Sequence, residues 1–410
     1  MRRHLLFIVT ERTSANGVCV KSVMQECFKR GYDVSCIVNR EYRDLNQFTE
    51  DGISFYTVKP RIVFSLGSYL ASVKHKKLKR MIVSIIRTIL NKVELMISIP
   101  TWPLISIGYS YRIFELIKLI HVKHNIDVVI PIYTQIDTII ASNKFKNLNK
   151  NIKVVPYMLD SLAAGYGPRM FSKEWIEKRG LKWEKRIFKS VDHIVMMKSS
   201  EDFYKIRNNL PYFGKISFLD IPLFVCPRKV NHTSNHCPVI LYVGSIPSHI
   251  RNPKYFLDVF HKLSKDIDVR LKIVGPSTCE SLLEQYISLD NRIERIQSVS
   301  HNRALEMIAE SDILLNLGNN ISTMMPSKIF EYISSGKPII STAPIPNEPS
   351  IKYLKMYGNA CILNEGESID ISASKLLKFL RDAHTVNPSD FSDVFKLNKP
   401  ETFVDIIDTI

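Results

Sequence analysis

Short apolar runs, many of them β-branched, alternate with helix-length amphipathic segments along most of the chain. In the first half these runs predict strands at residues 5–9, 34–38, 127–132, 153–159, 192–196 and 216–221. Residues 18–30 have helical spacing and end before Gly31, a favourable helix stop. The alternation of strand and helix is typical of a parallel sheet with crossover helices. We therefore expect a doubly wound α/β domain over residues 1–223.

The second half of the chain repeats the same alternation. Strands are predicted at residues 239–243, 269–274, 292–296, 313–317 and 338–340, with helices at 253–263, 302–310 and 327–335. Residues 224–238 lack apolar periodicity and are rich in Pro, Asn and His, which is typical of a linker. We expect a second Rossmann-like domain over residues 239–389, with the two domains facing a central cleft.

Length and composition support two globular domains and exclude several classes of protein. The 410 residues exceed what one core usually organises, and 45% of them are hydrophobic. Neither half has the glycine fingerprint of a dinucleotide-binding dehydrogenase or the phosphate loop of a P-loop ATPase. The seven cysteines include no Cys-x-x-Cys pair, and we find no signal peptide or membrane-spanning run. These features predict a cytoplasmic protein with reduced thiols.

A basic, apolar insert interrupts the alternation over residues 61–124. It holds eleven Lys and Arg against two Glu, a large share of the chain's net charge of +16. Within residues 80–99 the polar positions follow helical steps of three and four, and a very wide apolar face covers the rest. We expect this helix to lie in the interface of an anionic membrane, on its inner face. The alternative is a helix packed across the first domain. Because the insert lacks a recognition-helix motif and interleaved exposed aromatics, we do not expect nucleic-acid binding.

Residues 325–340, MPSKIFEYISSGKPII, contain the most informative candidate site. Ser327 is a suitable N-cap, and Lys328 would add a full charge to the positive end of the following helix, which suits a diphosphate. Glu331 lies one turn further on the same face, where a carboxylate can accept hydrogen bonds from the two hydroxyls of a ribose. The alternative is a simple ion pair between Lys328 and Glu331.

The same stretch closely resembles the donor-binding helix of retaining nucleotide-sugar glycosyltransferases with the GT-B fold, of the family-four-like bacterial polysaccharide type. LYVGSI with IRNPKYF, KIVGP and AESDILLNLG extend the resemblance over most of residues 239–363. It implies that Glu331 binds the ribose, that Arg251 and Lys328 bind the diphosphate, and that backbone near Val299 and Ser300 flanks the nucleobase. It also implies that residues 390–410 cross back to the first domain.

One departure from the family pattern concerns a pair of glutamates separated by seven residues. Thr323 stands where the first glutamate, which contacts the donor sugar in the family, would be. The loop of residues 318–325 then becomes a neutral polar cradle that includes Thr323. This departure keeps a second hypothesis open, a catalytically silent partner or glycan-binding protein, and a nucleotide-sugar epimerase of the same fold is a third.

Two residues of the first half complete the set of candidates. Gly17 would let the backbone approach a ligand closely, or it simply belongs to a strand-to-helix turn. Asp160 follows a predicted strand and would orient an acceptor hydroxyl or serve as a base, or it caps the next turn.

The resemblance therefore implies transfer of a hexosyl or related group, with retention, from a nucleotide diphosphate sugar to a lipid-linked or polysaccharide acceptor. Arg251 and Lys328 would stabilise the leaving group, so we expect no metal or other cofactor.

Overall fold

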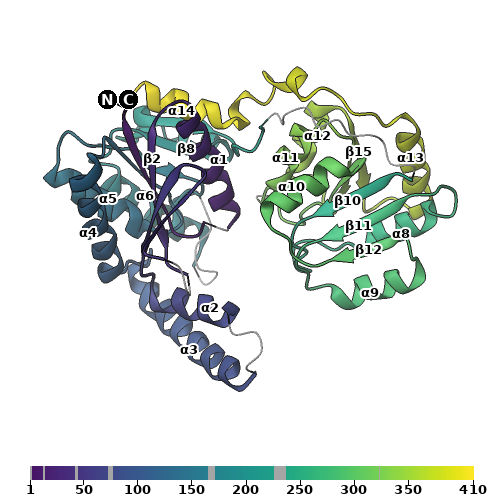
Figure 1. Ribbon diagram of the computed structural model, residues 1–410, viewed down its shortest axis with the longest axis horizontal. Coiled ribbons are helices and arrows are strands. Elements are labelled where there is room, and N and C mark those ends of the chain that lie inside the picture. The colour runs from purple at the N-terminus through teal and green to yellow at the C-terminus, as the bar shows by residue number, and fades with distance from the viewer. Residues whose placement is uncertain are drawn as a thin grey trace. The chain divides into compact units, whose positions relative to one another are not determined.

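The computed structural model describes residues 2–12, 14–41, 45–72, 77–164, 171–225, 237–322 and 324–410. The chain divides into two compact units. Unit 1 comprises Met1–Pro222 and Lys399–Ile410, and unit 2 comprises Leu223–Asn398 (Figure 1). Most of the expected linker, residues 226–236, lies outside the described residues.

Unit 1 is built on a six-stranded sheet with the order β3-β4-β2-β1-β5-β6. The strands are β1 (His4–Val9), β2 (Asp33–Asn39), β3 (Gln47–Glu50), β4 (Ile53–Val58), β5 (Val128–Pro131) and β6 (Lys153–Val154). All neighbouring pairs are parallel except β3 with β4. A second, parallel sheet holds β7 (Tyr157–Met158), β8 (Ile194–Met197) and β9 (Ile216–Leu219). A bridge from Ile132 to Tyr157 joins the end of β5 to β7.

Helices cover the sheets of unit 1. They include α1 (Ala15–Lys29), α4 (Ile107–His124), α5 (Ile136–Leu148), α6 (Lys173–Ile187) and α7 (Glu201–Lys205). The last helix, α14 (Pro400–Asp408), packs against α1, far away in the sequence, and the two ends of the chain lie near each other (Figure 1). Phe403 is fully buried beside Tyr157, and Arg30 on the rim donates to Asp405 over 2.6 Å. The C-terminal helix is therefore an integral part of unit 1.

The first half differs from the predicted strands in two places. The expected strand at 153–159 is split into β6 and β7 by residues 155 and 156, because Pro156 has no N–H to donate to a ladder. The antiparallel hairpin of β3 and β4 was not predicted. Its turn is Asp51–Gly52, and both residues have positive φ. An Asp-Gly pair between two strands is the strongest short-range hairpin signal in a sequence.

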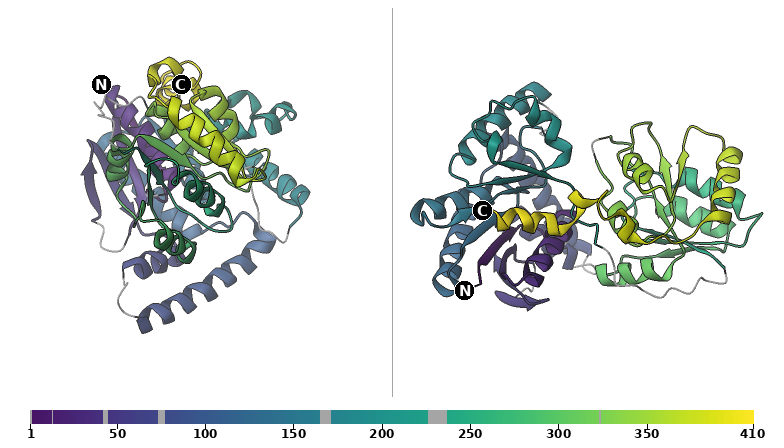
Figure 2. Two further views of the ribbon diagram at one scale, coloured as in Figure 1. Left: turned by 90° about the vertical axis from the view of Figure 1, so that its right-hand side faces the viewer. Right: turned by 90° about the horizontal axis from the view of Figure 1, so that it is seen from above.

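The basic, apolar insert comprises three helices with different roles: α2 (Ile62–Ser72), α3 (Lys77–Thr101) and α4. The interpretation of residues 61–124 as one appended segment is wrong for α4, which buries Tyr109, Ile113 and Ile117 in the core of unit 1. By contrast, α3 packs mainly against α2 and projects from the rest of unit 1 (Figure 2), and its large apolar side chains are exposed to solvent. Ile85 is 52% exposed and Met96 is 69% exposed. The alternative of a helix buried across the first domain is therefore wrong for α3.

No described helix combines the length and the apolar character that crossing a bilayer requires.

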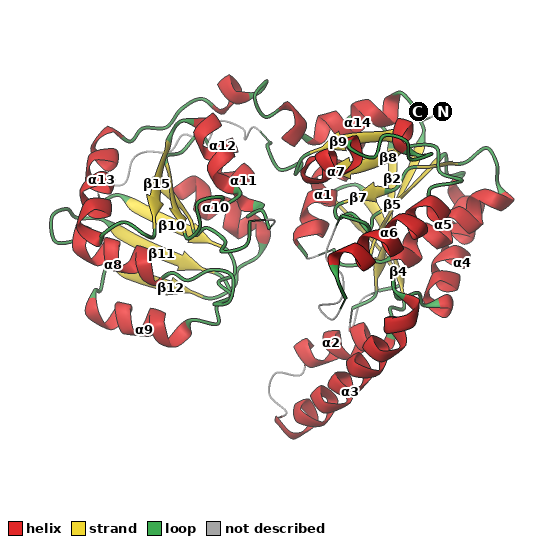
Figure 3. Ribbon diagram, turned by 180° about the vertical axis from the view of Figure 1, so that it is seen from behind, coloured by secondary structure: helices red, strands yellow, loops and turns green. Residues whose placement is uncertain are grey.

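Unit 2 is a six-stranded, wholly parallel sheet with the order β12-β11-β10-β13-β14-β15. The strands are β10 (Val239–Val243), β11 (Arg270–Val274), β12 (Ile293–Ile296), β13 (Ile313–Asn316), β14 (Ile339–Ala343) and β15 (Ala360–Asn364). The helices α8 (Lys254–Leu263), α9 (Glu280–Leu289), α10 (His301–Glu310), α11 (Lys328–Ser334), α12 (Ser350–Tyr357) and α13 (Ile369–Asp382) surround it (Figure 3). The strands predicted from residue 239 to residue 340 are confirmed to within a few residues.

The sheet order creates one special position in unit 2. From β10 the chain moves outward to β11 and β12, then returns to the other side of β10 as β13. The loops that follow β10 and β13 diverge at this switch point, and open α/β sheets bind ligands there, at the carboxyl ends of the strands. The doubly wound fold is thus confirmed in both units, with an antiparallel edge strand in unit 1.

Lys337 is a buried cation that supports unit 2 from inside. Its Nζ donates to the Ala309 carbonyl over 2.7 Å and to the Ser311 carbonyl, at the end of α10. Burial lowers the pKa of Lys337 from 10.5 to about 8, although the charge of Asp312 opposes this shift.

We expect this lysine to make the stability of the protein pH-dependent. Between pH 8 and 10.5 the unfolded chain binds more protons at Lys337 than the folded chain, so raising the pH stabilises the fold. The free energy of unfolding, followed by urea titration, should rise relative to that of Lys337→Met by no more than about 1.4 kcal/mol per pH unit. A difference between the two proteins that stays flat from pH 7.5 to 10 would contradict this expectation.

Candidate functional site

Two loops at the switch point of unit 2 are tied together by side-chain and backbone hydrogen bonds. They are residues 244–253, after β10, and residues 317–327, after β13. Arg251 Nε donates to Asn319 Oδ1 over 2.6 Å. The backbone N–H of Asn320 donates to the Ile250 carbonyl over 3.0 Å. Because the loops brace each other, the side chains that they carry are held in fixed relative positions.

Arg251 is a half-buried cation with three partners in this arrangement. Besides Asn319, its Nη1 donates to the Tyr242 hydroxyl and to the Ser245 carbonyl, both over 3.2 Å. Burial raises the pKa of the Tyr242 phenol, and the Arg251 charge works against that rise. Within the described residues Nη2 donates to no partner, so two N–H groups of a well-positioned guanidinium are free for an anionic ligand.

Asn319 is fully buried and holds the β13 loop from inside. Its Nδ2 donates to the Met324 carbonyl over 2.6 Å, and its backbone N–H donates to Glu348 Oε1 over 3.2 Å. Glu348 also accepts from the backbone N–H of Ser350 over 2.8 Å, and burial raises the pKa of its carboxyl. Sequence reasoning missed Asn319 and Glu348 as individual residues. The only available signal was their position after β13 and β14, strands of one parallel sheet.

Gly318, which precedes Asn319, is required by the closeness of β14. A Cβ at this position would lie 2.3 Å from the Thr342 carbonyl oxygen, and the Gly318 N–H donates to Thr342 Oγ1 over 3.1 Å. The loop after β13 therefore packs directly against β14, and this contact fixes the position of the Asn319 backbone.

Lys328 and Glu331 are paired on α11. Lys328 Nζ lies 2.8 Å from Glu331 Oε2, and the side chains are 29% and 8% exposed. The ion pair that the sequence left open as an alternative thus exists in the protein without a ligand. The helix is fastened to β10 through Tyr332, whose hydroxyl accepts from the Val243 N–H over 3.0 Å. Arg251 donates to the hydroxyl of Tyr242, the residue before Val243, so the loop after β10 and α11 are both attached to the carboxyl end of β10.

The expectation that the Ser327 side chain caps α11 is wrong. Ser327 has helical angles, φ −59° and ψ −28°, and its hydroxyl accepts no capping hydrogen bond. An N-cap side chain reaches the backbone from an extended conformation, which Ser327 does not adopt. The first turn instead uses backbone bonds, such as Phe330 N–H to the Ser327 carbonyl over 3.3 Å.

The structure places Val299 and Ser300 on a different strand end from this cluster. Val299 and Ser300 follow β12, two strands from β10 and so about 10 Å away at ordinary strand spacing. Ser300 is the N-cap of α10, where its Oγ accepts from the Arg303 N–H over 3.3 Å. Thr323 lies outside the described residues.

Gly17 lies within the first turn of α1 rather than in a loop. A Cβ there would be 2.3 Å from the Arg12 carbonyl oxygen and 2.4 Å from that of Glu11, so packing against the preceding loop already requires glycine. Ser14 caps the helix by accepting from the Gly17 N–H over 3.1 Å.

Asp160 follows β7 in unit 1. It is an exposed residue, yet the protein around its carboxyl removes enough water to raise the pKa of that group. The next turn is capped by Ser161, whose Oγ accepts from the Ala164 N–H over 2.8 Å, so Asp160 is not its cap. Ser161 also contacts the buried Tyr204 hydroxyl over 2.7 Å, which anchors the loop beside Asp160.

The cluster in unit 2 can bind an anion through its cations and, next to it, hydroxyl groups through its carboxylate. Arg251 and Lys328 supply positive charge, and Glu331 supplies a carboxylate that can accept hydrogen bonds from hydroxyls once Lys328 turns away from it. In the described parts of the chain, no three His, Cys, Asp or Glu side chains gather as metal ligands do.

The unit that holds these residues is also the part of the chain that matches a known family. Residues 237–382, almost the whole of unit 2, match the family model described as glycosyl transferases group 1. No curated protein sequence matches the chain.

Several solved structures share the whole fold at low sequence identity. WaaG, a glycosyltransferase involved in lipopolysaccharide biosynthesis, is 14% identical with a TM-score of 0.55, over 98% of this chain and 99% of that one. A glycosyltransferase from Rickettsia africae is 13% identical with a TM-score of 0.59, over 99% and 97%. The UDP-GlcNAc 2-epimerase from Methanocaldococcus jannaschii is 11% identical with a TM-score of 0.55, over 99% and 100%. These likenesses establish the GT-B fold, which transferases and epimerases share.

The two adjacent asparagines of the β13 loop provide a matched test of the site's construction. Asn319→Ala leaves the Met324 carbonyl and the Arg251 Nε without their buried partner, which should lower the free energy of unfolding by about 1–3 kcal/mol. Asn320→Ala removes only an exposed bond to the His249 carbonyl and should cost less than about 0.5 kcal/mol. Equal losses for the two variants in urea titrations would show that Asn319 does not hold the loop.

Proposed function

We propose that the chain is a group 1 glycosyltransferase that transfers a sugar, with retention, from a nucleoside-diphosphate sugar to a membrane-associated glycan or lipid-linked acceptor. The donor site is supported by Arg251, braced at the switch point of the unit that matches the family model, and by the Lys328–Glu331 pair on α11, the helix that follows the adjoining β13 loop. The lipopolysaccharide role printed for WaaG supports surface polysaccharide synthesis as the setting.

The cleavage step depends on stabilising the departing nucleoside diphosphate. As the bond between the sugar and the diphosphate breaks, negative charge grows on the phosphate oxygens. Arg251, preorganised by Asn319 and Tyr242, and Lys328 would face that charge, and such fixed donors lower a barrier because they need little reorganisation. Glu331 would accept hydrogen bonds from the ribose hydroxyls.

The acceptor hydroxyl must lose its proton during transfer. We propose that an oxygen of the donor phosphate takes this proton as the new bond forms on the same face of the sugar. Asp160 is the candidate for orienting the acceptor, and its raised pKa keeps a larger protonated fraction near neutral pH than an ordinary aspartate has.

Three substitutions test the donor site. Arg251→Met, Lys328→Met and Glu331→Gln should each reduce kcat/KM by about 10²–10³ while leaving the fold intact. The exposed Lys355→Met in the same unit is the control and should keep full activity. Activity is measured as nucleoside diphosphate released from a panel of nucleotide sugars with an acceptor extract. Unchanged rates in all three variants would contradict the assignment.

The same assay separates the two other hypotheses. An epimerase would convert the donor sugar without any acceptor, and a catalytically silent protein would release no nucleoside diphosphate. A thermal-shift panel adds a readout of binding alone, because a ligand that binds only the folded state raises its Tm. We expect one nucleoside diphosphate to raise the Tm of the wild type, and to raise it much less in Lys328→Met.

We further propose that α3 docks unit 1 on the membrane that carries the acceptor. Its exposed large apolar side chains are Leu78, Met81, Ile82, Ile85, Ile86, Ile89, Val93, Met96 and Ile97. Monomeric proteins rarely leave so large an apolar surface in water unless it is an interaction site. An amphipathic helix with basic flanks suits the headgroup region of a bilayer.

Membrane docking is tested with substitutions on the apolar face of α3. The double variant Ile82→Ser/Ile89→Ser should lower the affinity for phosphatidylcholine vesicles, measured by sedimentation, by about 10-fold or more. Each substitution removes most of the free energy gained when the isoleucine side chain leaves water for the bilayer. Charge reversals at Lys76, Lys77 and Lys79 should weaken binding to acidic vesicles at low salt. Lys76 lies outside the described residues, as does the side chain of Lys77. Sedimentation unaffected by both sets would rule out this face.

A further inference from the structure

We propose that the outer face of α6 is a second membrane contact, one that binds the anionic headgroups of an acidic bilayer. The inference rests on the proposed docking of α3 and deepens it, because it adds a second source of the preference for acidic lipid, on a helix outside the basic insert.

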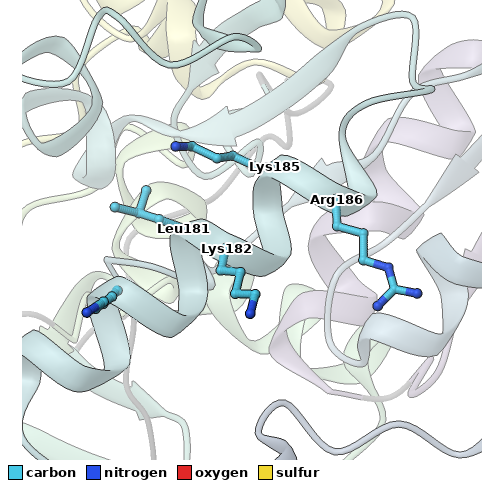
Figure 4. Close-up of a pocket in the computed structure, with 5 residues that line it drawn as sticks. Leu181, Lys182, Lys185 and Arg186 are labelled. Carbon is cyan, nitrogen blue, oxygen red and sulfur yellow. The ribbon is translucent and has the colours of Figure 1, made fainter.

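Four cations form one stripe on α6. Lys178, Lys182, Lys185 and Arg186 fall within about 100° of the helix circumference, at 100° per residue. With Leu181 they line a shallow hollow of about 540 Å³, and Figure 4 shows Lys182, Lys185 and Arg186 projecting outward from the helix. This outer face is therefore a concentrated positive surface.

The opposite face of α6 is fixed against the body of unit 1. A Cβ on Gly180 would lie 2.5 Å from Ala163 Cα, so the helix backbone touches the loop after β7. Glu184 is fully buried and accepts from the Tyr212 hydroxyl over 2.7 Å and from the Ala163 N–H over 3.0 Å. The Glu184 carboxylate is thus turned inward, and these contacts keep the four cations on the side of α6 that faces away from the core.

One exposed acid, Glu174, lies on the same face one turn before Lys178, so the stripe carries four cations against one carboxylate. Among the described residues, no carboxylate forms an ion pair with any of the four cations. Only Arg186 has a polar or ring partner: its guanidinium carbon lies 5.1 Å from the centre of the Trp183 ring. Glu177, beside the stripe, is already paired with Arg207 over 2.6 Å. Cations that no protein group neutralises are available to an external anion.

The occupant that fits this surface is a lipid bilayer, because α6 is joined to the end of α3. The Arg179 Nε donates to the Trp102 carbonyl over 2.9 Å, and the Trp102 and Trp175 rings lie 6.0 Å apart. Phe171 stacks on Trp175 at 4.0 Å. These aromatic rings belong to a small core cluster with Leu162 and Ile176, so they fix α6 to the end of α3. An apolar helix fixed beside a basic one suits the boundary between headgroups and acyl chains. A nucleic acid or a free polyanion would use the cations and leave the apolar face of α3 without a role.

The test compares two variants that change net charge equally. The first combines Lys178→Glu, Lys182→Glu and Lys185→Glu on α6. The control combines Lys265→Glu, Lys355→Glu and Lys378→Glu, exposed lysines of unit 2. Binding is measured by sedimentation with vesicles of phosphatidylcholine alone and of phosphatidylcholine mixed with phosphatidylglycerol, at low and high salt.

We expect the α6 variant to lose affinity for the acidic vesicles by about 100-fold at low salt, from roughly fivefold per basic residue at an anionic surface. Its affinity for neutral vesicles should match that of the wild type, and the unit 2 control should keep its preference for acidic vesicles. An α6 variant that keeps this preference, or a loss that is equal in the control, would overturn the inference.

The outcomes separate this inference from the proposed docking of α3. Substitutions on α3 should weaken binding to both kinds of vesicle, whereas those on α6 should remove only the response to acidic lipid. If the wild type binds neither kind, both membrane proposals fall, while the nucleoside diphosphate shift still reports on the donor site. If soluble polyphosphate binds the stripe and acidic vesicles do not displace it, the bilayer is the wrong occupant.

Discussion

The hydrogen bond from Arg251 to Asn319 is the contact on which the candidate site depends. It joins two loops that belong to strands paired directly in the sheet but separated by β11 and β12 along the chain. Without it the guanidinium would be held only by the two longer bonds of Nη1 to Tyr242 and Ser245, and the long side chain would lose more rotamer entropy on binding a ligand. Because Asn319 is buried and its own backbone is held by Glu348, the position of the cation is determined by the core of unit 2.

The pairing of Lys328 with Glu331 neutralises the two side chains on α11. Because Glu331 is only 8% exposed, separating the pair is costly unless both members gain new partners. In the proposed donor site a diphosphate would take Lys328 and the ribose hydroxyls would take Glu331. In both states, paired and ligand-bound, Tyr332 keeps α11 attached to β10.

The sequence predicted what depends on local pattern and missed what depends on packing. Strands such as β10 and β13 are continuous apolar runs, so their positions followed from the residues, and the fold class followed from their alternation with helices and from the resemblance. The hydrogen bonds of Asn319 and Glu348 could not be predicted, because they join segments that only the folded sheet brings together. The Ser327 cap was predicted from residue type, but capping requires a backbone angle that Ser327 does not adopt. The stripe on α6 is visible in the sequence, yet only burial of Gly180 and Glu184 shows which face is outward.

The most direct measurement is a crystal structure of the protein with the nucleoside diphosphate that raises its Tm most. The account predicts diphosphate oxygens within hydrogen-bond distance of Arg251 Nη2 and Lys328 Nζ, both ribose hydroxyls on Glu331, and the ion pair of Lys328 with Glu331 separated. A nucleotide bound elsewhere, with that pair still at 2.8 Å, would contradict the central claim.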